Sequence, residues 1–176
     1  MKKVSAVLSV LITLFIVVVL AGGSEARLMK QGTRELDING SYDQNTGAGS
    51  FFYTALGYGY YIRDDLELAV AGALMFADTY TGIHPAVSMT YDFETGTDWV
   101  PFVEANLGYG YWDFKPGTKS GFVYGGGGGI KYFLANNVAI SLAVDYDIAS
   151  EDLFEEKNGG WGKTNLGMHY GLRYYL

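Results

Sequence analysis

Apolar residues recur at every second position from about Arg34 to the end of the chain. Alternation of this kind is the pattern of a β-strand with one buried face. Clusters rich in Gly, Asn, Asp and Thr divide it into eight runs, at about 34–43, 50–62, 65–77, 82–94, 98–113, 120–134, 137–149 and 164–176. Each run is long enough to cross a bilayer, since a tilted strand needs only about 9–11 residues. The pattern predicts an all-β fold, an eight-stranded antiparallel up-and-down barrel.

The positions of the aromatic residues decide what surrounds this barrel. In the run 137–149, Leu142 falls on the apolar face and Ser141 on the polar face. A soluble barrel would show the same alternation, so the period alone does not identify the solvent. Trp99 and Tyr111, however, bracket the apolar face of the fifth run. Aromatic residues at both ends of an apolar band are typical of barrels that span a membrane.

The connections between the runs alternate in length. Tight turns are expected at 63–64, 94–97 and 135–136, whereas the connections at 43–49, 78–81, 114–119 and 150–163 end with one long loop. Membrane barrels keep short turns on the periplasmic side and longer loops outside. Two prolines, Pro85 and Pro101, cannot donate a ladder hydrogen bond, so we expect both near the rims.

The N-terminus has the layout of a secretory signal. Lys2 and Lys3 precede an apolar stretch, which ends in small residues up to Ala26. We expect a signal peptide over residues 1–26 and the barrel over 27–176, with cleavage after Gly23 as an alternative. An uncleaved membrane anchor is the competing interpretation, because the apolar stretch is close to spanning length.

Composition excludes several classes of function. The chain has 12 Lys and Arg against 19 Asp and Glu, a net charge of −7. An acidic chain without a basic patch gains nothing from neutralising phosphates, so we expect no nucleic-acid partner. The chain contains no Cys, which excludes disulfides, thiol catalysis, lipid attachment at Cys and Cys-based metal sites.

Three segments together resemble the OmpA-like family of small outer-membrane β-barrels. They are Pro101 to Tyr109, Gly128 to Leu134 followed by Asn136 to Ile140, and the final Tyr170 to Leu176. The resemblance implies the barrel domain alone, without a peptidoglycan-binding domain, in the outer membrane of a Gram-negative cell. It also implies contact with outer-membrane lipid and lipopolysaccharide, and insertion by the outer-membrane assembly machinery. The chain ends on Leu176, where Phe is usual.

The polar face of the strands carries charges that would point into the barrel. The acidic positions are Glu35, Asp37, Glu67, Asp92, Glu104, Asp145 and Asp147, and the cationic ones are Lys131 and Arg173, with His84 and His169 in the same phase. Charges in a narrow lumen must be paired or hydrated. We expect a charge network of Glu67, Glu104, Lys131, Asp145 and Arg173, in which the two cations bridge Glu67, Glu104 or Asp145. Large and small inward residues should interdigitate and leave no continuous path.

No constellation for catalysis stands out. A lipid A-modifying barrel enzyme needs a His beside a nucleophilic Ser, but His84 is followed by Pro85-Ala86 and His169 by Tyr170-Gly171. Residues 151–156 are acidic without the alternating spacing of a cation site. We therefore expect no cofactor and no metal.

The leading hypothesis is a non-enzymatic outer-membrane protein that contributes envelope integrity or surface contacts through its loops. The alternatives are a narrow ion-conducting pore and a lipid A-modifying enzyme.

Overall fold

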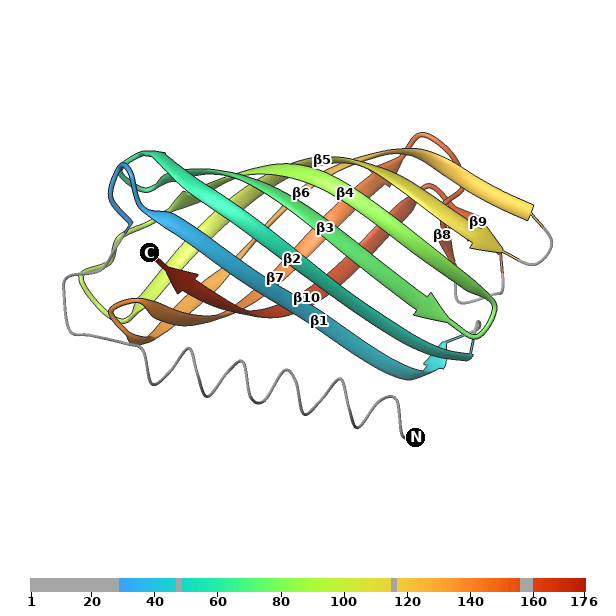
Figure 1. The fold of residues 1–176 in the computed structure, drawn as a ribbon, viewed down its shortest axis with the longest axis horizontal. Helices are drawn as coiled ribbons and strands as arrows, with labels where there is room; N and C mark the ends of the chain where they lie inside the picture. Colours follow the sequence, from blue (N-terminus) through green and yellow to red (C-terminus); the bar gives the residue numbers. More distant parts are fainter. Residues whose placement is uncertain (1–28, 47–48, 115–116, 156–159) are drawn as a thin grey trace.

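The computed structural model describes residues 29–46, 49–114, 117–155 and 160–176. These residues form a closed antiparallel barrel with the strand order β1-β10-β7-β6-β5-β4-β3-β2 (Figure 1). The barrel strands are β1 (Arg34–Thr46), β2 (Gly49–Arg63), β3 (Leu66–Ala77), β4 (Tyr80–Asp92), β5 (Trp99–Phe114), β6 (Gly117–Ala135), β7 (Val138–Ala149) and β10 (Thr164–Tyr175). The predicted eight-stranded up-and-down barrel is confirmed. The predicted signal peptide, residues 1–26, lies outside the described residues.

The outer surface of the barrel is an apolar belt. Alternate side chains along every strand point outward, so that Leu142 is 48% exposed while its neighbour Ser141 is 8% exposed. Exposed aromatic side chains lie toward both ends of the belt, with Tyr60, Tyr91, Phe93 and Trp99 at one end and Phe76, Tyr109, Tyr111 and Phe122 at the other. An apolar band between two aromatic rings fits a bilayer and not water. The barrel therefore spans a membrane, as its sequence predicts.

Both termini of the barrel lie at one end, here called the turn end. β1 and β10 close the barrel there, where Leu176 N donates to Arg34 O at 2.8 Å. The same end carries the connections from β2 to β3, β4 to β5 and β6 to β7 (Figure 1). Asp65, in the first of these turns, has a φ of 63°. The opposite end is called the loop end.

At the loop end, the strands extend into the segments that were predicted to be loops. β4 begins at Tyr80, so that the connection from β3 to β4 is only residues 78–79. β6 begins at Gly117, within the loop expected at 114–119. Polar residues of β6 pair with β5 here, including Lys119 with Trp112. Backbone ladder bonds do not require apolar side chains, which is why the alternation of apolar residues underestimates the length of these strands. The connection at 150–163 remains long and contains a separate two-stranded sheet, β8 (Phe154–Glu155) and β9 (Trp161–Gly162).

The expectation that both prolines lie near the rims is wrong for Pro85. Pro85 is the sixth residue of β4 and pairs with Gly72 of β3. On the other side of β4, no pair with β5 forms at His84 or Pro85, although the ladder continues in the same register around this gap. Proline has no N–H to donate, and the barrel tolerates the missing bonds within the wall. Pro101 does lie near the turn end, as the third residue of β5.

Among the residues that the structure describes, no helix is long and apolar enough to cross a membrane.

Candidate functional site: a closed floor and an acidic lumen

Six buried apolar side chains, here called the floor cluster, close the lumen at the turn end. They are Met29, Tyr61, Val100, Phe133, Ala139 and Tyr175. The rings of Phe133 and Tyr175 stack with their centroids 5.2 Å apart. Met29 precedes β1 and is only 1% exposed, so a residue from outside the barrel strands contributes to the closure. Buried side chains of this size fill much of the narrow interior of an eight-stranded barrel at this end.

The segment that carries Met29 is fastened to the first turn of the barrel. Asp65 N donates to Met29 O at 2.9 Å, and Gln31 N donates to the Asp64 carboxylate at 2.9 Å. The ammonium group of Lys30 lies 3.6 Å from Glu94 and 3.7 Å from Asp64. These two carboxylates raise the pKa of Lys30 above its ordinary value, whereas burial raises the pKa of Asp65. The contacts hold Met29 in the floor cluster.

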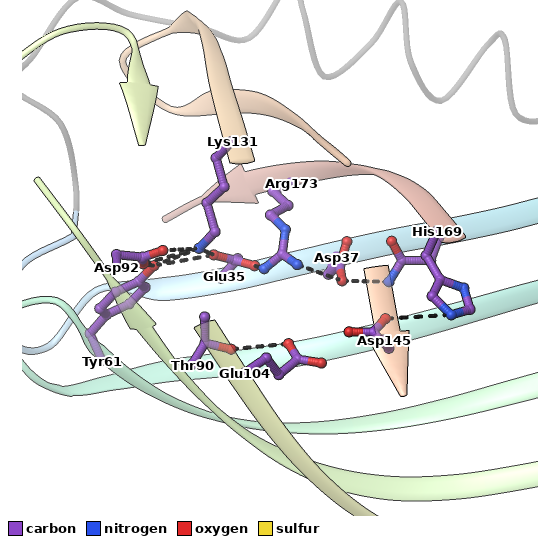
Figure 2. A network of polar contacts seen from close by, with 11 residues as sticks. Glu35, Asp37, Tyr61, Thr90, Asp92, Glu104, Lys131, Asp145, His169 and Arg173 are labelled. Carbon is purple, nitrogen blue, oxygen red and sulfur yellow. Dashed lines mark hydrogen bonds and ion pairs between the residues drawn. The ribbon is translucent and has the colours of Figure 1, made fainter. Parts of the chain in front are cut away.

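Next to the floor cluster lies a layer of four charged side chains, here called the charge layer. It consists of Glu35, Asp92, Lys131 and Arg173 (Figure 2). Lys131 is 0% exposed, and its Nζ lies 2.9 Å from Asp92 and 3.4 Å from Glu35. The hydroxyl of Tyr61 donates to Asp92 at 2.6 Å, which links the layer to the floor. Buried charges of this kind persist only when each is paired and hydrogen-bonded.

Arg173 extends the charge layer toward the loop end. Its Nη1 donates to Glu35 at 2.6 Å, and its Nη2 lies 3.7 Å from Asp37. Asn39 donates to the same Asp37 carboxylate at 2.6 Å. Glu35 therefore lies between both cations, which come from β6 and β10 on different parts of the wall (Figure 2). With Asp92 of β4 included, the charge layer ties four strands together across the lumen.

The predicted partners of the two cations are wrong. We expected Lys131 and Arg173 to pair with Glu67, Glu104 or Asp145, but their ion pairs are made with Glu35, Asp92 and Asp37. Glu104 instead accepts a hydrogen bond from Thr90 at 3.1 Å, and Asp145 lies 3.5 Å from His169. Glu67 is buried at 2% exposure and lines the lumen. The predicted residues are all in the lumen, but the structure divides them among separate contacts.

A cavity of about 720 Å³ occupies the lumen between the charge layer and the loop end. Many inward side chains here are small, as at Ala55, Ala69, Ala71, Ala86 and Ala143. Six carboxylates line the cavity, those of Glu35, Asp37, Glu67, Glu104, Asp145 and Asp147. Side chains therefore do not fill this half of the lumen, although Tyr53, Phe102 and Trp112 also line the cavity.

Side chains occupy the space beside several inward glycines, as the expected interdigitation of large and small residues predicts. The carboxylate of Glu67 occupies the space that a Cβ at Gly59 would take, and Asp145 does the same at Gly127. At Gly110 the space is taken by the indole of Trp112, two residues further along the same strand. At these positions a larger residue would displace a lumen side chain, so glycine allows the close approach.

The histidines of the lumen do not form a catalytic pair with serine. His84 stacks on Trp112, with ring centroids 6.4 Å apart, and its Nε2 is buried without a hydrogen-bond partner. His169 faces Asp145. Within the described part of the chain, no hydrogen bond joins either histidine to a serine, and no group of three or more His, Asp or Glu is arranged to hold a metal ion.

Sequence reasoning missed Met29 at the closed end, and it placed Glu35 and Asp92 in the lumen without predicting that they pair with the two cations. The first lies before the first predicted strand, so alternation does not reach it. The other two are inward and close to strand ends, since Glu35 is the second residue of β1 and Asp92 is the last residue of β4. Counting each inward charge from the turn end would have placed both at the depth of Lys131 and Arg173.

The structure is similar to solved outer-membrane barrels, whereas comparison of the sequence alone gives no match. No family model matches the chain, and no curated protein matches it. The N-terminal β-barrel domain of Pseudomonas aeruginosa OprF aligns with a TM-score of 0.62 at 18% identity, covering 83% of this chain and 98% of that one.

Two further structures give the same result. Neisserial surface protein A aligns with a TM-score of 0.59 at 19% identity, over 81% of this chain and 95% of that chain. The outer membrane protein OprG of Pseudomonas aeruginosa aligns with a TM-score of 0.55 at 13% identity, over 88% and 99% respectively. Identities this low establish the fold alone. The chain therefore has the eight-stranded, OmpA-like barrel fold of outer-membrane proteins, as its resemblance implied.

Proposed function

We propose that this chain is a non-enzymatic integral protein of the Gram-negative outer membrane, which does not conduct ions and contributes envelope integrity or surface contacts through its loops. The observation that carries the proposal is the closed turn end. There the floor cluster and the charge layer occupy the lumen, and Lys131 at 0% exposure is inaccessible to solvent. A barrel closed in this way is a membrane-spanning support for its outer loops.

The orientation follows from the turns. With the termini and tight turns in the periplasm, the loop end faces outside and presents the connection at 150–163 to the lipopolysaccharide layer. The outer-membrane assembly machinery is the expected partner during insertion, and β10 is the strand that must pair with β1 to close the barrel. Neither interaction requires a cofactor.

A narrow pore is the second candidate, and the lumen cavity favours it. The cavity of about 720 Å³ is lined by six carboxylates, which would favour cations if the turn end opened. A lipid A-modifying enzyme is disfavoured, because neither His84 nor His169 is hydrogen-bonded to a serine within the described residues.

Single-channel recording in planar bilayers tests the proposal. The wild-type barrel is expected to be silent. Arg173→Ala removes the guanidinium that holds Glu35 and Asp37, so intermittent leak is expected in this variant alone. Leu166→Ala, a lipid-facing change, serves as the control and should be silent. A steady cation-selective current from the wild-type protein would refute the proposal and favour the pore.

A further inference from the structure

Paired inward positions of five neighbouring strands form a row across the wall of the lumen. Glu67 of β3 pairs with Thr90 of β4, which pairs with Glu104 of β5. Glu104 also pairs with Gly127 of β6, which pairs with Asp145 of β7. The three acids Glu67, Glu104 and Asp145 all line the cavity and are here called the acidic row. Only a threonine and a glycine lie between them.

The acidic row spreads its charges along the lumen. Successive acids are two strands apart, which is about 10 Å within the wall and less between side chains that point into a narrow barrel. Glu67 is the second residue of β3, whereas Asp145 is the eighth residue of β7, and both strands begin at the turn end. The row therefore rises from the depth of the charge layer toward the loop end.

The acids of this row have no cationic partner of fixed charge. Among the residues that the structure describes, no Lys or Arg lies within ion-pair distance of any of the three. Glu104 accepts a hydrogen bond from Thr90, and Asp145 faces His169 at 3.5 Å (Figure 2). The lumen thus holds more acid than its own cations compensate.

Unsatisfied acceptors lie on the same wall. Glu67 is only 2% exposed, and no hydrogen bond or ion pair joins it to another described residue. Asn106, the next inward residue of β5, donates to Asp147 at 3.1 Å, but its buried Oδ1 has no partner. Buried polar groups are ordinarily hydrogen-bonded, and buried charges are paired. The cavity wall therefore fits a ligand that is positively charged and rich in hydrogen-bond donors.

The size of the cavity and the spacing of its acids favour an organic ligand. The volume of about 720 Å³ lies within the range of about 300–1,000 Å³ that is typical of small-molecule sites. Carboxylates that are two strands apart cannot share one metal ion, but they suit a chain with several cationic groups. Tyr53 and Phe102 line the same cavity, and aromatic faces attract ammonium groups.

We propose that the acidic row binds a linear polyamine, which enters from the loop end and lies along the row with its ammonium groups beside successive carboxylates. Each ammonium group donates charge-assisted hydrogen bonds to a carboxylate, and the methylene segments between them pack against the aromatic side chains of the cavity. The site occupies the outer half of the lumen, so it goes beyond the proposed function, which depends on the closed turn end.

Isothermal titration calorimetry with spermidine tests the site, because spermidine carries an ammonium group at each end and another between them. The barrel is held in nanodiscs of phosphatidylcholine, since an anionic lipid would itself bind the polyamine, and empty nanodiscs provide the blank. We expect one spermidine per barrel, with an affinity that falls as the salt concentration rises. Putrescine, which lacks the central ammonium group, should bind more weakly. Triethylene glycol, which is uncharged, should not bind.

Four variants locate the binding. Glu104→Gln removes the central carboxylate of the row and should weaken binding about tenfold or more, as expected for the loss of a hydrogen bond to a charged group. Asp145→Asn should have a similar effect. Ala71→Phe fills part of the cavity without changing its charge, and it should also weaken binding. Glu151→Gln removes one carboxylate from the exposed loop and should leave the affinity unchanged. Heat-modifiable gel migration confirms that each barrel is folded.

Three results would overturn the site. The first is the absence of spermidine binding to the wild-type barrel. The second is an equal affinity of the wild type, Glu104→Gln and Ala71→Phe, which would place the polyamine on the acidic outer surface. The third is binding of Mg²⁺ as tight as that of spermidine and lost in Glu104→Gln, which would identify a metal site. Single-channel recording decides the proposed function separately, so a silent wild type that binds no spermidine would refute this site alone.

Discussion

Replacing Lys131 by Met tests whether the charge layer is held by ion pairs. Methionine keeps most of the methylene chain but removes the ammonium that lies 2.9 Å from Asp92 and 3.4 Å from Glu35. Glu35 retains Arg173 as a partner, whereas Asp92 retains only the hydroxyl of Tyr61. Removing one partner of a buried ion pair costs about 3–5 kcal/mol, because the remaining charge has no compensation. We expect Lys131→Met to lower the free energy of unfolding by about this amount.

Urea titration in lipid vesicles, followed by tryptophan fluorescence, measures this loss. The companion variant is Asp92→Asn, which removes the charge left uncompensated by Lys131→Met. The double variant should lose less than the sum of the two single losses, with a coupling of about 1–3 kcal/mol. Glu151→Gln is a suitable control, since it removes a carboxylate from an exposed loop position.

Two results would contradict the reasoning. One is a loss of less than about 1 kcal/mol for Lys131→Met, the range expected of an exposed ion pair. The other is strict additivity of Lys131→Met and Asp92→Asn. Either result would mean that water, and not the ammonium group, compensates the carboxylates of the charge layer.

Two further predictions concern the wall. Leu142→Arg places a charge in the middle of the lipid-facing belt and should cost about 2–4 kcal/mol in the same titration, whereas Thr164→Arg at the rim should cost about 0–1 kcal/mol; equal costs would contradict the assigned faces. Gly59→Ala should destabilise the barrel by about 1–3 kcal/mol, because its Cβ would take the place of the Glu67 carboxylate. Gly72→Ala is its control, since a Cβ there meets nothing within 4 Å, and equal stability of these two variants would contradict the close packing.

The alternation predicts most of the fold, because it records the two environments of each strand directly. Leu142 faces lipid and Ser141 faces the lumen, as expected. The same logic placed Lys131 and Arg173 inside. The rim position expected for Pro85 came instead from the preference of proline for rims, and it was wrong because a closed wall can lose the bonds of one residue.

The contacts inside the lumen could not be predicted in the same way. Lys131 and Glu35 are on β6 and β1, strands that do not pair with each other. Whether two such residues meet depends on the stagger of the closed barrel, which sets the height of every inward side chain. A local pattern contains no information about that stagger. This is why the acids expected to pair with Lys131 were replaced by Glu35 and Asp92.

The sequence by itself determined the eight strands, the face on which each side chain lies and the membrane environment of the outer surface. All three follow from the two-residue period of a strand, which is visible in the spacing of apolar residues along the chain. Only the tertiary structure decided that Met29 joins the buried cluster at one end of the lumen and Leu153 a second buried cluster at the other, with a cavity between them. Both residues lie outside the barrel strands, so their positions follow from where the chain returns across the ends of the barrel once it has closed.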